Sequence, residues 1–348
     1  MAPLKIYVDG EDSLGWSIDQ DRQHIKKIIS NIPMDITRHW WMADIVHNIW
    51  WNQLSNRKNI LKRYFSKNLL VTCSNFIDPH HPDFEPNLKA FHQISKCAKG
   101  WICPSKKQLL ILEGLNMRAY WQPFFVDIVA FSPSPETKET LCKKFDIPYS
   151  VVKNKIIIGS FQRDSRGDDL SKGKWHKNPD LLIDILKAQD PSKYILLLAG
   201  PRRHYLRSKC KEFSIPYYFI GEEIEADDLT QNALPYEKMP DLYNLIDLYL
   251  ITSASEGGPK AVMEAPATKT MIMSTDVGAA ADFVHPDYVF EQNESGSRKY
   301  TEAVSDFINN GSSDKFLGII DRQYTQAKDI LNSGEMAKRL CNIYEDIL

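Results

Sequence analysis

The chain has 348 residues, which is long enough for two domains with separate hydrophobic cores. With 43 basic and 45 acidic residues its formal net charge is -2, so the overall charge does not indicate a nucleic acid or another polyanion as partner. The six cysteines form no C-x-x-C pair, which argues against a zinc ribbon or a redox motif. No apolar run is long enough to span a membrane and no signal peptide is recognisable, so we expect a cytoplasmic protein with reduced thiols.

The first predicted elements are those that open a Rossmann-like domain. The apolar segment Lys5–Val8 is typical of a strand, and a loop containing Gly10 and Gly15 leads from it to a helix at Asp21–Ile29. Nearly every α/β domain opens in this way, so the pattern predicts a fold class and not yet a site.

A window without acidic residues follows, from Ile45 to Ile77, with strands predicted at Met42–His47 and Asn68–Thr72. It carries five cations, Arg57, Lys58, Lys62, Arg63 and Lys67. Apolar residues repeat there at helical spacing, namely Ile60, Leu61, Tyr64 and Phe65, which predicts an amphipathic helix with a basic side. Two interpretations stay open: the helix lies on an anionic membrane surface, or its apolar face packs on its own domain while the cations are solvated.

The segment Asp78–Asp83 combines two acids with His80 and His81. Its two prolines predict a turn, and adjacent histidines cannot easily face one ion, so we expect a loop and not a metal site. A strand and turn at Gly100–Ser105 and a helix at Lys106–Gly114 follow.

Proline-rich residues Ser132–Pro135 predict the end of the first domain. We expect a first domain at residues 1–132, a linker with a helix at 133–152, a second domain at 153–322 and a terminal helical segment at 323–348. The chain after Phe290 is polar and predicted to be loop-like until a helix begins at about Asp314.

In the second domain, a long loop rich in cations runs from Arg163 to Lys177 after a predicted strand. The buried strand Leu248–Thr252 leads into Glu256, the turn Gly257-Gly258-Pro259 and, eight positions after Glu256, Glu264. Because proline suits the first turn of a helix, this predicts strand, glycine turn and helix. Two carboxylates about 12 Å apart, if the whole span were helical, could hold opposite ends of a long polar ligand. Alternatively, they are acids favoured at a helix start by its dipole.

Four segments in this order resemble the retaining GT-B glycosyltransferases of family 4, the glycosyl transferases group 1. They are Arg163 after its strand, Lys177 with Asn178–Ile183, Ser253–Glu264, and the strand and glycine turn Met271–Gly278. The segment Pro123–Pro133 is similar to the family's exit from its first domain. The resemblance covers about residues 1–290 and is closer in the second domain.

The resemblance implies an α/β GT-B fold, with two Rossmann-like domains facing each other across a cleft, acceptor in the first and donor in the second. It also implies that the C-terminal helix at 323–348 returns to the first domain. It implies retaining transfer from a nucleotide sugar, UDP- or GDP-linked, without a required metal, in the synthesis of surface polysaccharide or another glycoconjugate. Arg163 and Lys177 would hold the diphosphate, with Lys172-Gly173 as the alternative to Lys177. The donor-sugar residues would be Glu256, Gly257, Gly258, Pro259 and Lys260, and Glu264 would hold the ribose.

The chain departs from the family pattern at two places. Where the family has Val-Thr-x-His, this chain has Val71-Thr72-Cys73-Ser74, so His47, Ser74 and His81 are all candidates for the residue that replaces the histidine on the acceptor side. The resemblance also implies that the loop around Gly15 faces the acceptor. Pro266 stands where a small residue is usual, and the hydrogen bond that it removes predicts a kink that shifts Glu264. Lys260 would suit a donor sugar with an acidic or acylated group.

Two other function classes stay open: a GT-B nucleotide-sugar epimerase or sugar phosphorylase, and a non-catalytic nucleotide-sugar-binding protein. A lipid-linked acceptor would place the protein at the inner face of the membrane, with peripheral contact through residues 57–67.

Overall fold

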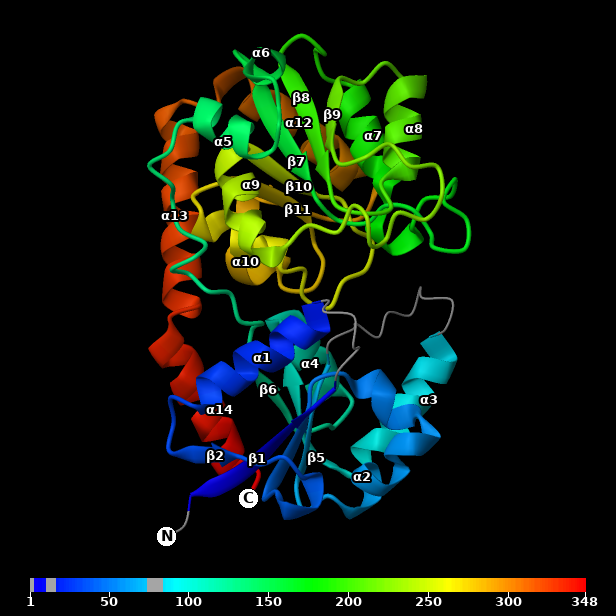
Figure 1. The fold of residues 1–348 in the computed structure, drawn as a ribbon, viewed down its shortest axis with the longest axis vertical. Coiled ribbons are helices and arrows are strands. Elements are labelled where there is room, and N and C mark those ends of the chain that lie inside the picture. The colour runs from blue at the N-terminus through cyan, green and yellow to red at the C-terminus, as the bar shows by residue number, and fades with distance from the viewer. Residues whose placement is uncertain (1–2, 11–16, 74–83) are drawn as a thin grey trace. The chain divides into compact units, whose positions relative to one another are not determined.

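The computed structural model describes residues 3–10, 17–73 and 84–348. The chain forms two compact units, one made of Met1–Val126 with Asp329–Leu348 and the other of Asp127–Lys328. Each unit is built on one six-stranded parallel sheet with helices packed against it (Figure 1). This confirms the predicted α/β class with two Rossmann-like units. None of the helices in these ranges is long and apolar enough to cross a membrane.

The first unit has the sheet order β2-β1-β3-β4-β5-β6, with all neighbours parallel. Its elements are β1 (Leu4–Asp9), α1 (Ser17–Ile29), β2 (Met34–Ile36), η1 (Trp40–Met42), β3 (Ile45–Asn48), η2 (Trp51–Ser55), η3 (Arg57–Asn59), α2 (Ile60–Phe65), β4 (Leu69–Thr72), α3 (Phe84–Ser95), β5 (Ala98–Cys103), α4 (Lys106–Gly114), β6 (Ala119–Trp121) and α14 (Ser333–Asp346). The strand predicted from Met42 begins only at Ile45, because Trp40–Met42 form the 3-10 turn η1.

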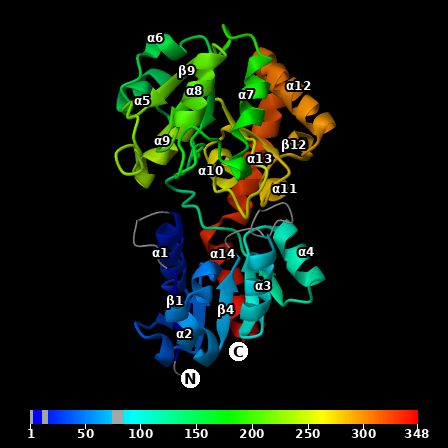
Figure 2. The ribbon, with the colours of Figure 1, turned by 90° about the vertical axis from the view of Figure 1, so that its right-hand side faces the viewer.

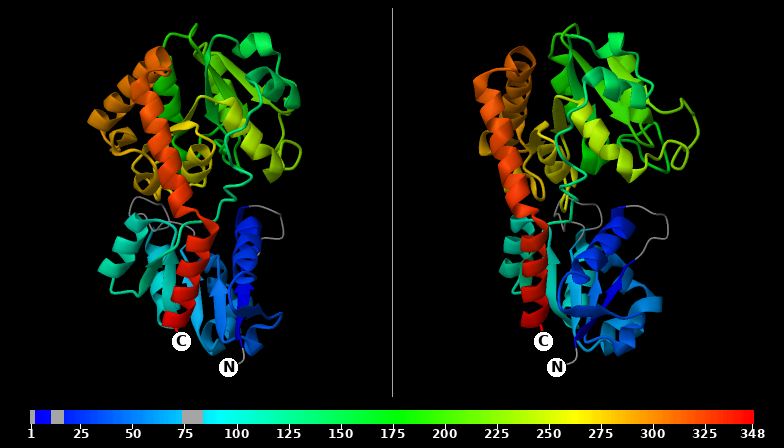
Figure 3. Two further views of the ribbon diagram at one scale, coloured as in Figure 1. Left: turned by 90° about the vertical axis from the view of Figure 1, so that its left-hand side faces the viewer. Right: turned by 60° about the vertical axis from the view of Figure 1, so that its left-hand side comes forward.

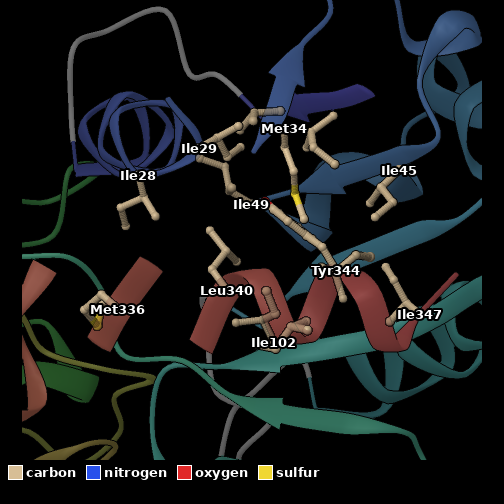
Figure 4. Close-up of a cluster of buried hydrophobic side chains, with 14 of the residues drawn as sticks. Ile28, Ile29, Met34, Ile45, Ile49, Ile102, Met336, Leu340, Tyr344 and Ile347 are labelled. Atoms are coloured by element: carbon tan, nitrogen blue, oxygen red, sulfur yellow. The ribbon is translucent and has the colours of Figure 1, made fainter. Parts of the chain in front are cut away.

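The C-terminal helix α14 belongs to the first unit, although more than 200 residues of the other unit separate it from β6. Figure 3 shows this helix, in red, lying against the sheet, and Figure 4 shows its side chains in the core. Leu340, Tyr344 and Ile347 pack there with Ile28 of α1 and Ile102 of β5. Burial of these apolar groups is what attaches the end of the chain to its beginning.

His47 of β3 lies beneath that helix and is fully buried. Its Nδ1 forms a hydrogen bond with Tyr344 Oη at 2.8 Å, and its Nε2 forms one with Thr72 Oγ1 at 2.9 Å. Burial lowers the pKa of His47 to about 3, because an imidazolium would lose its hydration there. The ring is therefore a neutral link between two neighbouring strands and α14.

The second unit has the sheet order β12-β11-β10-β7-β8-β9, again all parallel. Figure 2 shows this unit and its helices from a second side. Its elements are α5 (Lys138–Lys144), α6 (Tyr149–Val152), β7 (Ile156–Ser160), η4 (Trp175–Lys177), α7 (Pro179–Lys187), β8 (Tyr194–Ala199), α8 (His204–Glu212), β9 (Tyr217–Ile220), η5 (Tyr236–Lys238), α9 (Met239–Leu245), β10 (Leu248–Ile251), α10 (Ala261–Ala267), β11 (Met271–Thr275), α11 (Ala280–Phe283), η6 (Pro286–Tyr288), β12 (Val289–Phe290), α12 (Glu294–Asn310) and α13 (Asp314–Ile330). Residues 133–152, predicted as a linker, contain α5 and α6 and belong to this unit.

The order of strands in the second unit fixes where a ligand would bind. Chain direction across the sheet reverses between β7 and β10, which are neighbours. In such doubly wound sheets ligands bind outside the carboxyl ends of the strands at this switch point. Arg163 follows β7 and Ser253 follows β10, so both predicted segments start there.

The prediction of a loop after Phe290 is wrong, because α12 occupies Glu294–Asn310. The polar composition concealed one apolar stripe at helical spacing, made of Tyr300, Val304, Phe307 and Ile308, all buried. Asn293 supplies the start signal, since its side chain accepts a hydrogen bond from Gly296 N at 2.8 Å. The helical segment after Asp314 is divided into α13 and α14, and Asn332 caps the second of them.

A buried ion pair anchors the loop that leaves β7. Arg203 and Asp164 lie 3.0 Å apart with side chains 0% and 2% exposed. Asp164 also accepts hydrogen bonds from Leu206 N and Ser165 Oγ, and Arg203 donates to Ser160 Oγ. Polar partners of this kind offset the desolvation of two buried charges.

We expect the stability of the first unit to fall on acidification because of His47. The pKa of His47 is depressed in the folded state, so below pH 6.5 its imidazole is protonated in the unfolded chain and stays neutral in the folded one. Stability is complete above pH 6.5 and decreases by about 1.4 kcal/mol per pH unit toward pH 3. Urea unfolding at several pH values should show a shallower slope for His47→Gln. Exposed His92→Gln is the control, and an unchanged slope in His47→Gln would contradict the assignment.

Two adjacent arginines give a second stability test. Arg203→Met leaves Asp164 buried without its counter-ion, which should cost about 3–5 kcal/mol. Arg202→Met removes a pair with Asp227, whose side chain is 42% exposed, and should cost less than about 1 kcal/mol. Denaturant unfolding of both variants compares the two; equal losses would mean that burial does not govern them.

Candidate functional site

The turn after β10 is held in one conformation by its own neighbours. Ser253 Oγ donates a hydrogen bond to Glu256 Oε1 at 2.8 Å, and Thr275 Oγ1 of β11 donates to Ser253 O at 2.6 Å. Gly278 has φ +47°, and a Cβ there would lie 2.6 Å from Gly257 O. The glycine after β11 therefore allows its loop to lie directly on the turn that carries Glu256.

The loop between β7 and α7 folds back on itself and reaches the same place. Lys174 N donates to Asp164 O at 2.6 Å next to an antiparallel bridge between Ser165 and Gly173. Asn178 has φ +43° and directly precedes Pro179, the first residue of α7. That left-handed residue turns the chain from η4 into the helix and so fixes the position of Lys177.

Backbone and side chain together join the loop to the turn. Ala254 N donates to His176 O at 2.9 Å, and Ser255 N donates to the same oxygen at 3.2 Å. Lys177 Nζ forms an ion pair with Glu256 Oε1, in which the side chains are 20% and 12% exposed. The structure thus brings together two residues predicted from the sequence 79 positions apart. Lys172 instead forms an exposed ion pair with Asp169.

Four cations face this region. Burial lowers the pKa of Lys174 to about 8, and repulsion from Arg163, Lys177 and Arg202 adds to the effect, while Glu256 opposes it. Burial also lowers the pKa of Arg163, with a further contribution from Arg202. Two carboxylates, Glu256 and Asp227, lie near these four cations, so an excess of positive charge remains that favours a ligand with several negative charges, such as a diphosphate.

Glu264 lies deeper, on α10, and is 5% exposed. Its Oε2 accepts a hydrogen bond from Tyr243 Oη at 2.9 Å. Helix α10 begins only at Ala261, so the span from Glu256 is not helical and the 12 Å estimate does not apply. Pro266 lies inside α10 without ending it, and the helical bond from Glu264 N to Lys260 O is intact at 2.9 Å.

Of the four residues predicted on the acceptor side, the structure describes only His47. Gly15, Ser74 and His81, and with them Asp78–Asp83, lie outside the described residues. His47 is described, and both of its ring nitrogens already bond to protein groups, so its contacts are those of a structural residue. Within residues 3–10, 17–73 and 84–348, no three His, Cys, Asp or Glu side chains are placed to hold a metal ion.

Sequence reasoning assigned no role to Lys174 or Arg202 in this region. Lys174 was visible as one of several cations in the loop, but its neighbours could not be inferred without the bridge between Ser165 and Gly173. Arg202 comes from the β8–α8 connection and has φ +56°, and Gly167 leaves the space in which its guanidinium lies.

The second unit resembles a known family of proteins. Residues 170–318, within the second unit, match the family model described as glycosyl transferases group 1. The putative teichuronic acid biosynthesis glycosyltransferase TuaC of Bacillus subtilis is 21% identical over 227 residues, which is 65% of this chain and 50% of that protein. The chain therefore spans about half the length of this curated relative.

Solved structures resemble the whole chain. Anabaena HepE in complex with UDP and glucose superposes with a TM-score of 0.72 at 14% identity, covering 99% of this chain and 100% of that one. A glycosyltransferase from Rickettsia africae superposes with a TM-score of 0.70 at 13% identity, and the match covers 100% of this chain and 99% of that one. WaaG, a glycosyltransferase involved in lipopolysaccharide biosynthesis, has a TM-score of 0.67 at 11% identity and covers 98% and 99%. At these identities the likeness shows the fold, which is the predicted GT-B class.

Proposed function

We propose that the chain is a retaining glycosyltransferase that moves a sugar from a UDP- or GDP-linked donor to a glycan, lipid-linked or small-molecule acceptor. The observation that carries this proposal is the group of cations around Lys174, namely Arg163, Lys177 and Arg202, with Lys177 paired to Glu256, beside the switch point of the second sheet. The match of residues 170–318 to the glycosyl transferases group 1 and the HepE structure with UDP and glucose support it.

The chemistry asked of these residues is stabilisation of a departing nucleoside diphosphate. Negative charge grows on the diphosphate as the glycosidic bond breaks, and fixed cations lower the energy of that state. Arg163 and Lys177 would contact the diphosphate directly, and Lys174 and Arg202 would add to the field. Since these charges belong to the protein, the proposed reaction does not require a metal.

Glu256 and the turn Gly257–Lys260 would hold the donor sugar, and Glu264 the ribose hydroxyls. A carboxylate beside a diphosphate would repel it, and the ion pair with Lys177 offsets that repulsion. The hydrogen bond from Tyr243 fixes Oε2 of Glu264, which leaves the orientation of its carboxylate defined. Lys260 would favour an acidic or acylated sugar.

The proposed setting is the synthesis of a surface polysaccharide or glycoconjugate in the cytoplasm, at the inner face of the membrane where a lipid-linked acceptor is displayed. The name of TuaC and the role printed for WaaG support this setting. An epimerase, a phosphorylase and a binding protein remain the rivals, and product analysis distinguishes them.

Replacement of Glu256 tests the enzyme directly. Glu256→Gln removes a charge that contacts Lys177 and, in the proposal, the donor sugar, so turnover should fall at least about 100-fold, the size of effect seen when one electrostatic contact to a transition state is lost. Release of UDP or GDP from its sugar conjugates measures this, with exposed Glu237→Gln as control. Wild-type protein that binds the donor but releases no nucleotide would favour the binding protein instead. Inversion of the anomeric configuration in the product would overturn retention.

Nucleotide binding should also take up a proton through Lys174. Near pH 8 about half of the Lys174 side chains are neutral, and a bound diphosphate raises this pKa again, so affinity falls as the pH rises through 8. Calorimetry of UDP and GDP in buffers of different ionisation enthalpy should show the uptake at pH 8. Lys174→Met should lose it, whereas Lys172→Met, an exposed cation of the same loop, should keep it. Equal proton uptake in the wild type and both variants would mean that Lys174 is not the group that takes up the proton when the diphosphate binds.

A further inference from the structure

Helix α2 turns its basic face toward its own domain and exposes its apolar face. Its cations point inward: Lys62 Nζ pairs with Asp9 at 2.8 Å, and Arg63 donates to Leu54 O at 3.4 Å. Its apolar side chains point outward, with Leu61 61% and Phe65 72% exposed. The packing expected for a solvated amphipathic helix is therefore reversed, which removes one of the two interpretations that the sequence left open.

The exposed apolar face continues beyond α2. The helix packs on η1, η2 and η3, and η1 contributes Trp41 and Met42, which are 65% and 51% exposed. Tyr64 is exposed as well and stacks against Arg63 at 4.7 Å. We call these five exposed residues, Trp41, Met42, Leu61, Tyr64 and Phe65, the apolar surface. Because η1 and α2 are in contact, these large exposed apolar side chains lie on neighbouring elements, and such a group is typical of an interaction site.

An open hollow of about 510 Å³ lies at η2 and η3, which adjoin this surface. It is lined by Gln53, Asn56, Arg57, Lys58 and Asn59, which supply amides and two exposed cations without any acid. Arg57 and Lys58 are thus available for an anionic group at the rim of the apolar surface.

We propose that the apolar surface inserts into the interface of an anionic lipid bilayer while Arg57 and Lys58 receive lipid phosphate groups. Tryptophan, tyrosine and cations are the residue types that anchor proteins at this depth. Leu61 and Phe65 would enter the boundary of the acyl chains, where exposed apolar area gains free energy. The acid-free sequence from Ile45 to Ile77 removes repulsion from the lipid headgroups. The inference uses only the first unit and does not depend on the donor site.

Sedimentation with vesicles tests it. The full-length protein should bind vesicles of phosphatidylglycerol with phosphatidylcholine, and bind phosphatidylcholine alone weakly. Leu61→Ser/Phe65→Ser should weaken binding more than about tenfold, since two large apolar contacts are lost. Arg57→Gln and Lys58→Gln should each weaken it about fivefold. Leu110→Ser/Leu317→Ser is the matched control, because those leucines are 66% and 49% exposed on α4 and α13.

A second readout reports orientation. Lipids brominated on the acyl chains should quench the fluorescence of wild-type protein more than that of Trp41→Phe. Unchanged binding of Leu61→Ser/Phe65→Ser, or equal losses in the leucine control, would overturn the proposal. The proposal would also be overturned if the wild-type protein formed a dimer, did not bind vesicles, and became monomeric in Leu61→Ser/Phe65→Ser. A second copy of the chain would then cover the apolar surface. Nucleotide-induced thermal shifts in each variant check folding and keep this result separate from the donor site.

Discussion

The ion pair between Lys177 and Glu256 is the interaction on which the arrangement of the candidate site depends. It joins the loop after β7 to the turn after β10, the two connections that leave neighbouring strands at the switch point. Both side chains are largely buried, so the attraction is screened little by solvent. A change at either partner would therefore affect both connections, which the hydrogen bonds from Ala254 N and Ser255 N to His176 O also join.

The surrounding loop structure places Lys177 next to Glu256. The loop must turn sharply before α7, and Asn178 accepts the left-handed conformation that the turn demands. Behind it, the buried pair of Asp164 and Arg203 holds the start of the same loop. The cations around Lys174 repel one another, and Glu256 offsets only part of this repulsion. In the proposed function a bound diphosphate would relieve the rest, so the positive charge is in place before the ligand binds.

Local signals account for what the sequence predicted correctly. Strand and turn patterns located β7 and β10, and the parallel topology then placed Arg163 and Ser253 at one edge of the sheet. Most of what failed required knowledge of distant partners. The cation Arg202 joins the group through the β8–α8 connection. The apolar stripe of α12 is the exception, because it is a local pattern that the surrounding polar residues concealed. The link between His47 and Tyr344 spans 297 positions, and no local pattern records it.

Helix α2 shows the same limit most clearly. Its periodicity predicted two faces, but periodicity does not say which face turns inward. The orientation follows from two contacts. Lys62 donates to the buried carboxylate of Asp9, 53 positions away at the end of β1, and Arg63 donates to Leu54 O. With its cations committed to the domain, the helix can only present Leu61 and Phe65 to the outside. One buried carboxylate in the first strand thereby determines what the surface of the first unit can bind.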